Sequence, residues 1–206
     1  MVRFLVVVLL LIGVEASAQS YRGVSAGYRW SGIPGFLLGS SFSNHESVQA
    51  HAGQVEFFRG SGRGYWSVGM LMGGLVVPDG YWRVKDTLPE EGVFAEFPLR
   101  FVGGTISRTW QFPLGAGWSV NPTVGLGLLG LIGDIYATEV IPGCKELPCG
   151  HWNQVTRHPV ALSSRVLPVF QAFVGLGYEL FPGAQVSLET GFVNLPFLGL
   201  SVRVVP

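Results

Sequence analysis

The stretch WSVNPTVGLGL, residues 118–128, decides the fold of this chain. Tryptophan, valine, proline and leucine occupy every second position, and serine, asparagine, threonine and glycine fill the positions between them. A period of two over this length predicts a β-strand with one apolar face and one small, polar face. The polar face is too small and too polar to form a packed core. We therefore expect it to line the interior of a narrow barrel, while the apolar face contacts lipid.

The same alternation recurs along the chain and predicts about eight strands. Pro98 and Pro122 have no amide hydrogen to donate, so we expect bulges where they interrupt the pattern. The prediction is an all-β fold, an antiparallel up-and-down transmembrane β-barrel. The other predicted strands are residues 23–30, 54–57, 65–73, 95–101, 170–179, 185–192 and 200–204.

The connections between these strands alternate in length. Short turns are expected at residues 60–64, 112–115 and 181–184, and long loops at residues 31–52, 78–92 and 139–160. The fourth loop, near residues 194–196, is short. In bacterial barrels the short turns face the periplasm and the long loops face outward. Both ends of the barrel domain should then lie on the periplasmic side.

The first residues predict export. Arg3 precedes an apolar run at residues 4–14, and Ala16-Ser17-Ala18 forms a small-residue cleavage site. This is the pattern of a secretory signal peptide, and the run is too short to span a bilayer as a helix. We expect residues 1–18 to be the cleaved signal peptide and residues 19–206 to be one barrel domain.

Composition supports the same class of protein. Charged residues make up 13% of the chain, about half the share usual in soluble domains, and mean hydropathy is +0.41. The formal net charge is zero, which argues against nucleic acid as a partner. The expected partner is outer-membrane lipid, in a bacterium of the Gram-negative type, with an envelope or surface protein as a further candidate through the long loops.

Several charged residues fall on the face that is predicted to point inward. Three are basic and four acidic, so we expect internal ion pairs that plug the lumen. A charge-lined pore or proton path is the alternative. The predicted lumen charges are Arg29, Glu56, Glu96, Arg100, Glu179, Glu189 and Arg203.

The first long loop contains the residues that most resemble catalytic groups. Pro34 can open a short helix, and the stretch that follows it brings together Ser43, His45, Glu46, Ser47 and His51. A serine nucleophile needs a base that a carboxylate orients, which makes a lipid-modifying enzyme an alternative interpretation. No glycine frame of the nucleophile-elbow kind surrounds either serine of the loop, so we expect no catalytic residues.

Cys144 and Cys149 flank a short ring in the third long loop. With His151 and His158 nearby, a metal site is conceivable, but the histidine spacing is wide for zinc. Cysteines of an exported protein favour a disulfide, so we expect a bridge and neither metal nor cofactor.

The remaining loop residues are candidates for contact with a partner. Tyr81 and Trp82 follow the turn signature Pro78-Asp79-Gly80 and suggest interfacial anchors or a ligand platform. The candidate contact residues are Phe36, His45, Glu46, Tyr81, Trp82, His151 and Trp152.

On these patterns the chain resembles the small eight-stranded outer-membrane barrels related to the OmpA transmembrane domain and OmpX. The resemblance covers residues 19–206 and rests on alternation. It differs at the last strand, since such barrels typically finish on an aromatic residue and this sequence reads Val204-Val205-Pro206. Members act as envelope anchors, adhesins, narrow channels or lipid enzymes. We expect a non-enzymatic envelope barrel with a structural or surface-interaction role, and keep the channel and the enzyme as alternatives.

Overall fold

The structure is a computed structural model that describes residues 20–88, 91–139 and 156–206. The predicted signal peptide lies outside these ranges. So do Cys144, Cys149, His151 and Trp152, and their predicted roles remain predictions.

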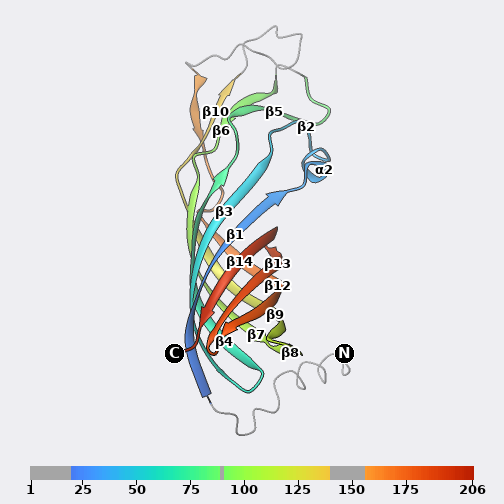
Figure 1. The fold of residues 1–206 in the computed structure, drawn as a ribbon. Helices are drawn as coiled ribbons and strands as arrows, with labels where there is room; N and C mark the ends of the chain where they lie inside the picture. The colour runs from blue at the N-terminus through green and yellow to red at the C-terminus, as the bar shows by residue number, and fades with distance from the viewer. Residues whose placement is uncertain (1–19, 89–90, 140–155) are drawn as a thin grey trace, which may run out of the picture.

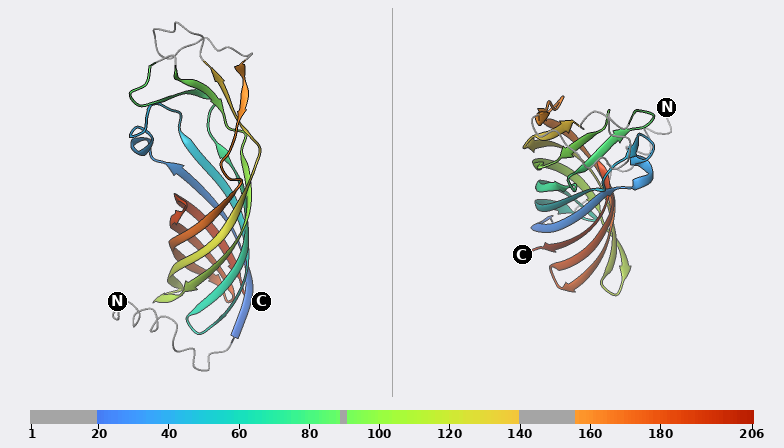
Figure 2. Two further views of the ribbon diagram at one scale, coloured as in Figure 1. Left: turned by 180° about the vertical axis from the view of Figure 1, so that it is seen from behind. Right: turned by 90° about the horizontal axis from the view of Figure 1, so that it is seen from above.

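Within the described residues, eight long strands form a closed antiparallel barrel (Figures 1 and 2). Each strand pairs with the next along the chain, and the last pairs with the first, so the topology is up-and-down, as predicted. β8 (Phe112–Gly115) is a short strand that forms a hairpin with the start of β9. The barrel strands are β1 (Ser20–Ile33), β3 (Val48–Ser61), β4 (Gly64–Val76), β7 (Arg100–Trp110), β9 (Trp118–Ile132), β12 (Val166–Phe181), β13 (Ala184–Val193) and β14 (Leu195–Val204).

The two faces of the barrel wall differ as the sequence predicts. Val124, Leu126 and Leu188 face outward and are about half exposed, whereas Thr123 and Ser187 face inward and are buried. Large apolar side chains therefore cover the outside, and small polar side chains line much of the inside. This distribution is the one that a membrane-spanning barrel needs, and it is the reverse of a water-soluble barrel. In the described part of the chain, no helix has both the length and the apolar character to cross a bilayer.

Glycines make room inside the barrel. A Cβ atom at Gly127 would lie 2.2 Å from the carbonyl oxygen of Gly104 on the neighbouring strand β7. Side chains at such positions would collide with the wall, so the glycine-rich face of β9 lets the strands close into a narrow ring.

The long connections form a second, smaller sheet beyond one end of the barrel, which we call the loop sheet. Its order is β11-β10-β6-β5-β2, so each of the three long connections contributes at least one strand. Figure 1 shows it at the end opposite the C-terminus. The short helix expected after Pro34 is α2 (Gly35–Leu38). The loop-sheet strands are β2 (Phe42–Asn44), β5 (Gly80–Val84), β6 (Val93–Glu96), β10 (Ile135–Glu139) and β11 (His158–Val160).

The fourth connection is short and held by one side chain. Asn194 has a positive φ of 53°. Its amide nitrogen donates to the carbonyl oxygen of Pro168 at 2.7 Å, and its amide oxygen accepts from the amide of Phe170 at 2.9 Å. Asparagine tolerates this left-handed conformation better than most residues, which explains the tight turn between β13 and β14.

The strand predicted at residues 95–101 is wrong. β6 ends at Glu96, and the barrel strand β7 begins only at Arg100. Between them, the amide of Leu99 donates to the carbonyl oxygen of Phe97 at 2.7 Å, a tight bend around Pro98. Because of this bend, the alternation of inward and outward side chains does not continue from β6 into β7. Glu96 lies in the loop sheet and Arg100 is exposed on the outward face of β7, so neither is a lumen charge.

The bulge predicted at Pro122 is also absent. The pairing of β9 with β12 runs in continuous register through Pro122, which lies opposite Val174. On the other side of β9, pairing with β7 ends at Thr123 and pairing with β8 resumes at Val120, so the ladder is interrupted at Pro122 without a shift of register.

Candidate functional site

The middle of the lumen holds a buried ion pair. Arg29 of β1 contacts Glu189 of β13, with 3.2 Å between guanidinium nitrogen and carboxylate oxygen and side chains 6% and 13% exposed. The guanidinium also lies beside the rings of Phe173 and Phe197, at 4.6 and 4.8 Å from their centroids, and the two rings contact each other edge-to-face at 5.5 Å. Ser201 donates to Glu189 at 2.5 Å. A guanidinium so far from water is stable only with a counter-charge and aromatic faces around it.

Glu56 of β3 is the second carboxylate inside the barrel. It accepts hydrogen bonds from Ser25, at 3.2 Å, and from the amide of Gln54. These polar partners lie on β1 and on the same strand. Glu56 is therefore held by neutral donors, in contrast to Glu189.

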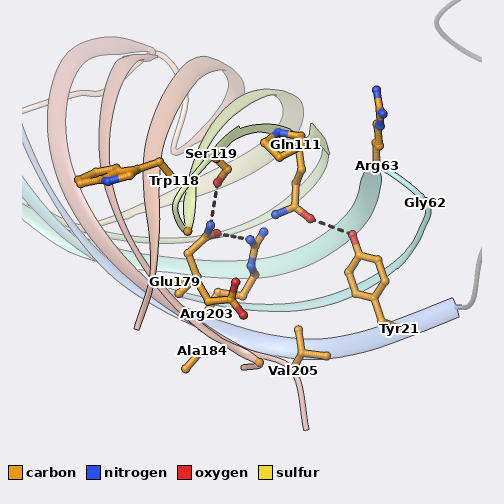
Figure 3. A pocket seen from close by; sticks show the side chains of 15 residues that line it. Tyr21, Gly62, Arg63, Gln111, Trp118, Ser119, Glu179, Ala184, Arg203 and Val205 are labelled. Atoms are coloured by element: carbon orange, nitrogen blue, oxygen red, sulfur yellow. Dashed lines mark hydrogen bonds between the residues drawn. The ribbon is translucent and has the colours of Figure 1, made fainter. Parts of the chain in front are cut away.

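Arg203 of β14 lies nearer the short-turn end of the lumen. Its guanidinium is 4.9 Å from the ring centroid of Tyr65 and 5.7 Å from that of Phe58, and it donates to the amide oxygen of Gln185. Gln185 in turn donates to Ser119 at 2.7 Å. Figure 3 shows this chain of polar contacts from Ser119 towards Arg203. Arg203 thus lies against a pair of contacting aromatic rings, as Arg29 does.

Little free space remains in the lumen between these charged and aromatic side chains. The cavity that touches both Glu56 and Glu189 is small, with a volume of about 30 Å³. The mouth at the short-turn end is wider, at about 470 Å³. Glu179 lines this mouth and is exposed, so it lies at the rim and not in the buried part of the lumen (Figure 3).

Two of the inward aromatic rings, those of Phe58 and Phe197, are the part of the lumen that sequence reasoning missed. Phe58 and Phe197 are buried, at 4% and 5% exposed, and they contact Arg203 and Arg29 respectively. The alternation of side chains along each strand could have identified them. Phe58 is an even-numbered residue of β3, like the buried Gln54, and therefore faces inward.

The loop sheet has its own apolar cluster around Trp82, which we call the loop core. The Trp82 ring meets Phe42 edge-on with centroids 5.3 Å apart and Phe97 at 5.4 Å, and Leu38 and Ala95 are buried beside it. These residues come from the first and second long connections. The loop core therefore joins loops that are distant in sequence into one folded unit.

Tyr81 and Trp82 were predicted as candidates for contact with a partner, but the structure leaves little of either side chain accessible. They are 6% and 9% exposed because they pack within the loop sheet. A Cβ atom at Gly92 would fall 2.2 Å from the Tyr81 ring, which shows how closely the second loop packs on it. Phe36, by contrast, is 77% exposed on α2 and is available for contact.

The described geometry assembles no serine–histidine–carboxylate relay in the first loop. The Ser43 hydroxyl accepts from the Arg83 guanidinium at 2.9 Å. His45 Nδ1 contacts the backbone carbonyl of Glu46, at 3.4 Å. His51 lies on the outward face of β3, where Nδ1 meets the Tyr28 hydroxyl. These groups face different neighbours. Among the described residues, no cluster of three histidine, cysteine or acidic side chains could hold a metal ion.

Glu96 joins the second and third long connections through Arg157. The carboxylate accepts from the guanidinium at 3.2 and 2.7 Å, and the guanidinium stacks on Tyr136 at 3.8 Å from the ring centroid. The hydrogen bonds from Arg157 hold the pKa of Glu96 below its ordinary value of 4.5. This pair closes the loop sheet on the side opposite the loop core.

Strand pairing and face orientation together define the class of protein, an eight-stranded antiparallel barrel of the membrane-spanning kind. No family model matches the sequence, and no curated protein matches it. The chain is similar to the solved structure of Neisserial surface protein A, with 12% identity and a TM-score of 0.43 over 92% of this chain and 99% of that one.

A second similar structure is Ail, the attachment invasion locus protein of Yersinia pestis. The identity is 9% and the TM-score 0.42, over 92% of this chain and 99% of Ail. The structure of Ail with the heparin analogue sucrose octasulfate gives 10% identity and a TM-score of 0.40, over 91% and 98% of the two chains.

The Glu96–Arg157 pair predicts a pH response that is confined to the loop sheet. Because the pKa of Glu96 is lowered in the folded protein, the stabilisation is complete above 4.5 and is lost as the pH falls through the lower folded value. The backbone amide of Ala137, which lies between Ala95 and His158 in the sheet, should report the loss in an NMR titration in micelles. The midpoint should lie below 4.5.

Glu96→Gln is the matched control, because it keeps the shape and removes the charge. The Ala137 titration should vanish in this variant. A midpoint at or above 4.5, or the same titration in Glu96→Gln, would show that another group governs the sheet.

Proposed function

We propose that this chain is a non-enzymatic outer-membrane barrel whose closed lumen serves as a rigid support and whose loop sheet is a surface for a partner. The observation that carries the proposal is the joining of all three long connections into one sheet with its own buried core. Ordinary connecting loops have no need of such a core. A loop surface that is already ordered loses less conformational entropy when a partner binds.

The outside of the barrel supports a membrane location. Trp66, Trp118 and Tyr178 are exposed near the short-turn end, and Tyr28 and Trp30 are exposed towards the loop end. Aromatic residues at both ends of an apolar belt are typical of outer-membrane barrels. Together with the predicted signal peptide, this favours the outer membrane with the loop sheet facing outward.

The loop region carries the exposed apolar side chains that a partner surface needs. They lie on α2, at the end of β5, in the connection between β5 and β6, and at the end of β11. Such side chains add binding energy when a partner covers them. They are Phe36, Leu37, Val84, Leu88 and Val160.

The small central cavity supports a lumen that does not conduct. We expect purified wild-type protein to be electrically silent in planar bilayers, because Arg29 and its aromatic neighbours fill the bore. Replacing Arg29 and Phe173 together by alanine should open a path and produce discrete conductance steps. Heat-modifiable migration on a gel checks that both proteins are folded barrels. Conductance steps from the wild type would contradict a closed lumen.

Photo-crosslinking on intact cells tests the surface role. With p-benzoylphenylalanine in place of Phe36, the most exposed aromatic of the loop region, irradiation should yield a discrete adduct with another protein. The same substitution at the lipid-facing Leu126 is the matched control and should give no protein adduct. Trp82→Ala, which removes the centre of the loop core, should abolish the adduct at Phe36 while the barrel stays intact.

Two results would contradict the surface role. One is the absence of protein adducts both with the photoreactive residue at Phe36 and, in a second variant, with it at the exposed Val84. The other is an identical adduct from Leu126, which would place the contact on the barrel wall.

A further inference from the structure

A groove lies against the barrel where β1 begins, at the end that carries the short turns. Its volume is about 800 Å³, and Arg22, Val24, Phe57, Arg59 and Val204 are among the residues that line it. The pairing of β1 with β14 begins at Val24 and Val204, so the first residues of β1 have a barrel neighbour only in β3. Figure 1 shows this start of β1 extending past the end of β14.

Two arginines face each other in this groove. Arg22 and Arg59 are direct partners in the pairing of β1 with β3, and both side chains are exposed. Neither takes part in an ion pair with another residue of the described ranges. Like charges directly opposite each other across a strand pair are destabilising. A bound anion between the two guanidinium groups would remove that repulsion.

The groove is apolar on the side nearer the middle of the barrel. Val24 follows Arg22 on β1, and Phe57 precedes Arg59 on the antiparallel strand β3, so both arginines lie further towards the short-turn end than their apolar neighbours. Phe57 is 67% exposed, and Val24 and Val204 are also exposed. The groove therefore has a charged end and an apolar end. The charged end lies further from the middle of the barrel, which matches the positions of the headgroup and the acyl chains of a lipid in a leaflet.

The depth of the arginines matches a headgroup. Arg59 lies directly opposite Trp66 of β4, whose ring is exposed on the outer wall. Exposed tryptophans of membrane proteins gather at the level of the headgroups. Arginine binds phosphate oxygens with two parallel hydrogen bonds, which suits a phosphodiester at this level.

We propose that this groove binds an anionic phospholipid of the leaflet at the short-turn end. Arg22 and Arg59 hold the phosphate, and the acyl chains lie along Val24, Phe57 and Val204. The ligand class is phosphatidylglycerol-like, because a zwitterionic headgroup would bring a further positive charge to two arginines. The inference rests on the membrane location proposed above.

The test uses the purified full-length chain in nanodiscs that contain equal amounts of phosphatidylglycerol and phosphatidylethanolamine. Native mass spectrometry counts the lipids that stay bound. Wild-type protein should retain phosphatidylglycerol selectively, and Arg22→Gln or Arg59→Gln should each lower the selectivity about fivefold, the worth of one arginine near an anionic surface. The double variant should show no preference. Arg63→Gln is the matched control, because Arg63 is an exposed arginine of the nearby turn that lies outside the groove.

Thermal unfolding provides a second readout, for which the proposal predicts the direction of the change in unfolding temperature. In an uncharged detergent, the double variant should unfold at the same or a higher temperature than the wild type, because the repulsion is gone. Added phosphatidylglycerol should raise the unfolding temperature of the wild type and of Arg63→Gln, and leave the double variant unchanged. Inorganic phosphate should have no such effect.

Three outcomes would overturn the proposal. They are equal retention of the two lipids by the wild type, an equal loss of selectivity in Arg63→Gln and Arg59→Gln, and stabilisation by inorganic phosphate that matches that by the lipid. Failure of the membrane location would appear separately, as protein that does not enter nanodiscs as a heat-modifiable barrel.

Discussion

The pairing of β1 with β14 is the constraint on which the rest of the structure depends. Backbone amides and carbonyls that are not hydrogen-bonded are very unfavourable in hydrocarbon, so strands can span a membrane only in a closed ring. The register from Val24 with Val204 to Ser31 with Phe197 supplies this closure. Once the ring is closed, each strand has one face towards lipid and one towards the lumen, and the sequence alternation assigns each residue to a face.

Closure in turn explains the chemistry of the interior. A ring of eight strands encloses so narrow a space that side chains fill it. Charges there have little water, and the structure surrounds Arg29 with Glu189 and two aromatic rings and Arg203 with Tyr65 and Phe58. The functions that we propose therefore lie at the two ends of the barrel, with the loop sheet at one end and the arginine-lined groove at the other.

The sequence was sufficient for the fold class, the direction of the faces and the short helix after Pro34, because period-two alternation is a local property. It was insufficient where local signals compete. The bend at Pro98 resets the parity, which moved Glu96 and Arg100 out of the predicted lumen. The burial of Trp82 depends on contacts between separate loops, and no periodicity within one loop records them.

The most direct test of the account is the direction of the side chains in the membrane. Spin labels at single cysteines, in a chain without its native cysteines, report accessibility to oxygen and to a nickel chelate in lipid vesicles. Labels on the apolar face should collide with oxygen and avoid the chelate, whereas labels on the polar face should show little of either. The reverse pattern, or no alternation, would contradict a membrane-spanning barrel. The apolar-face positions are Ile106, Val124 and Leu188, and the polar-face positions are Ser107, Thr123 and Ser187.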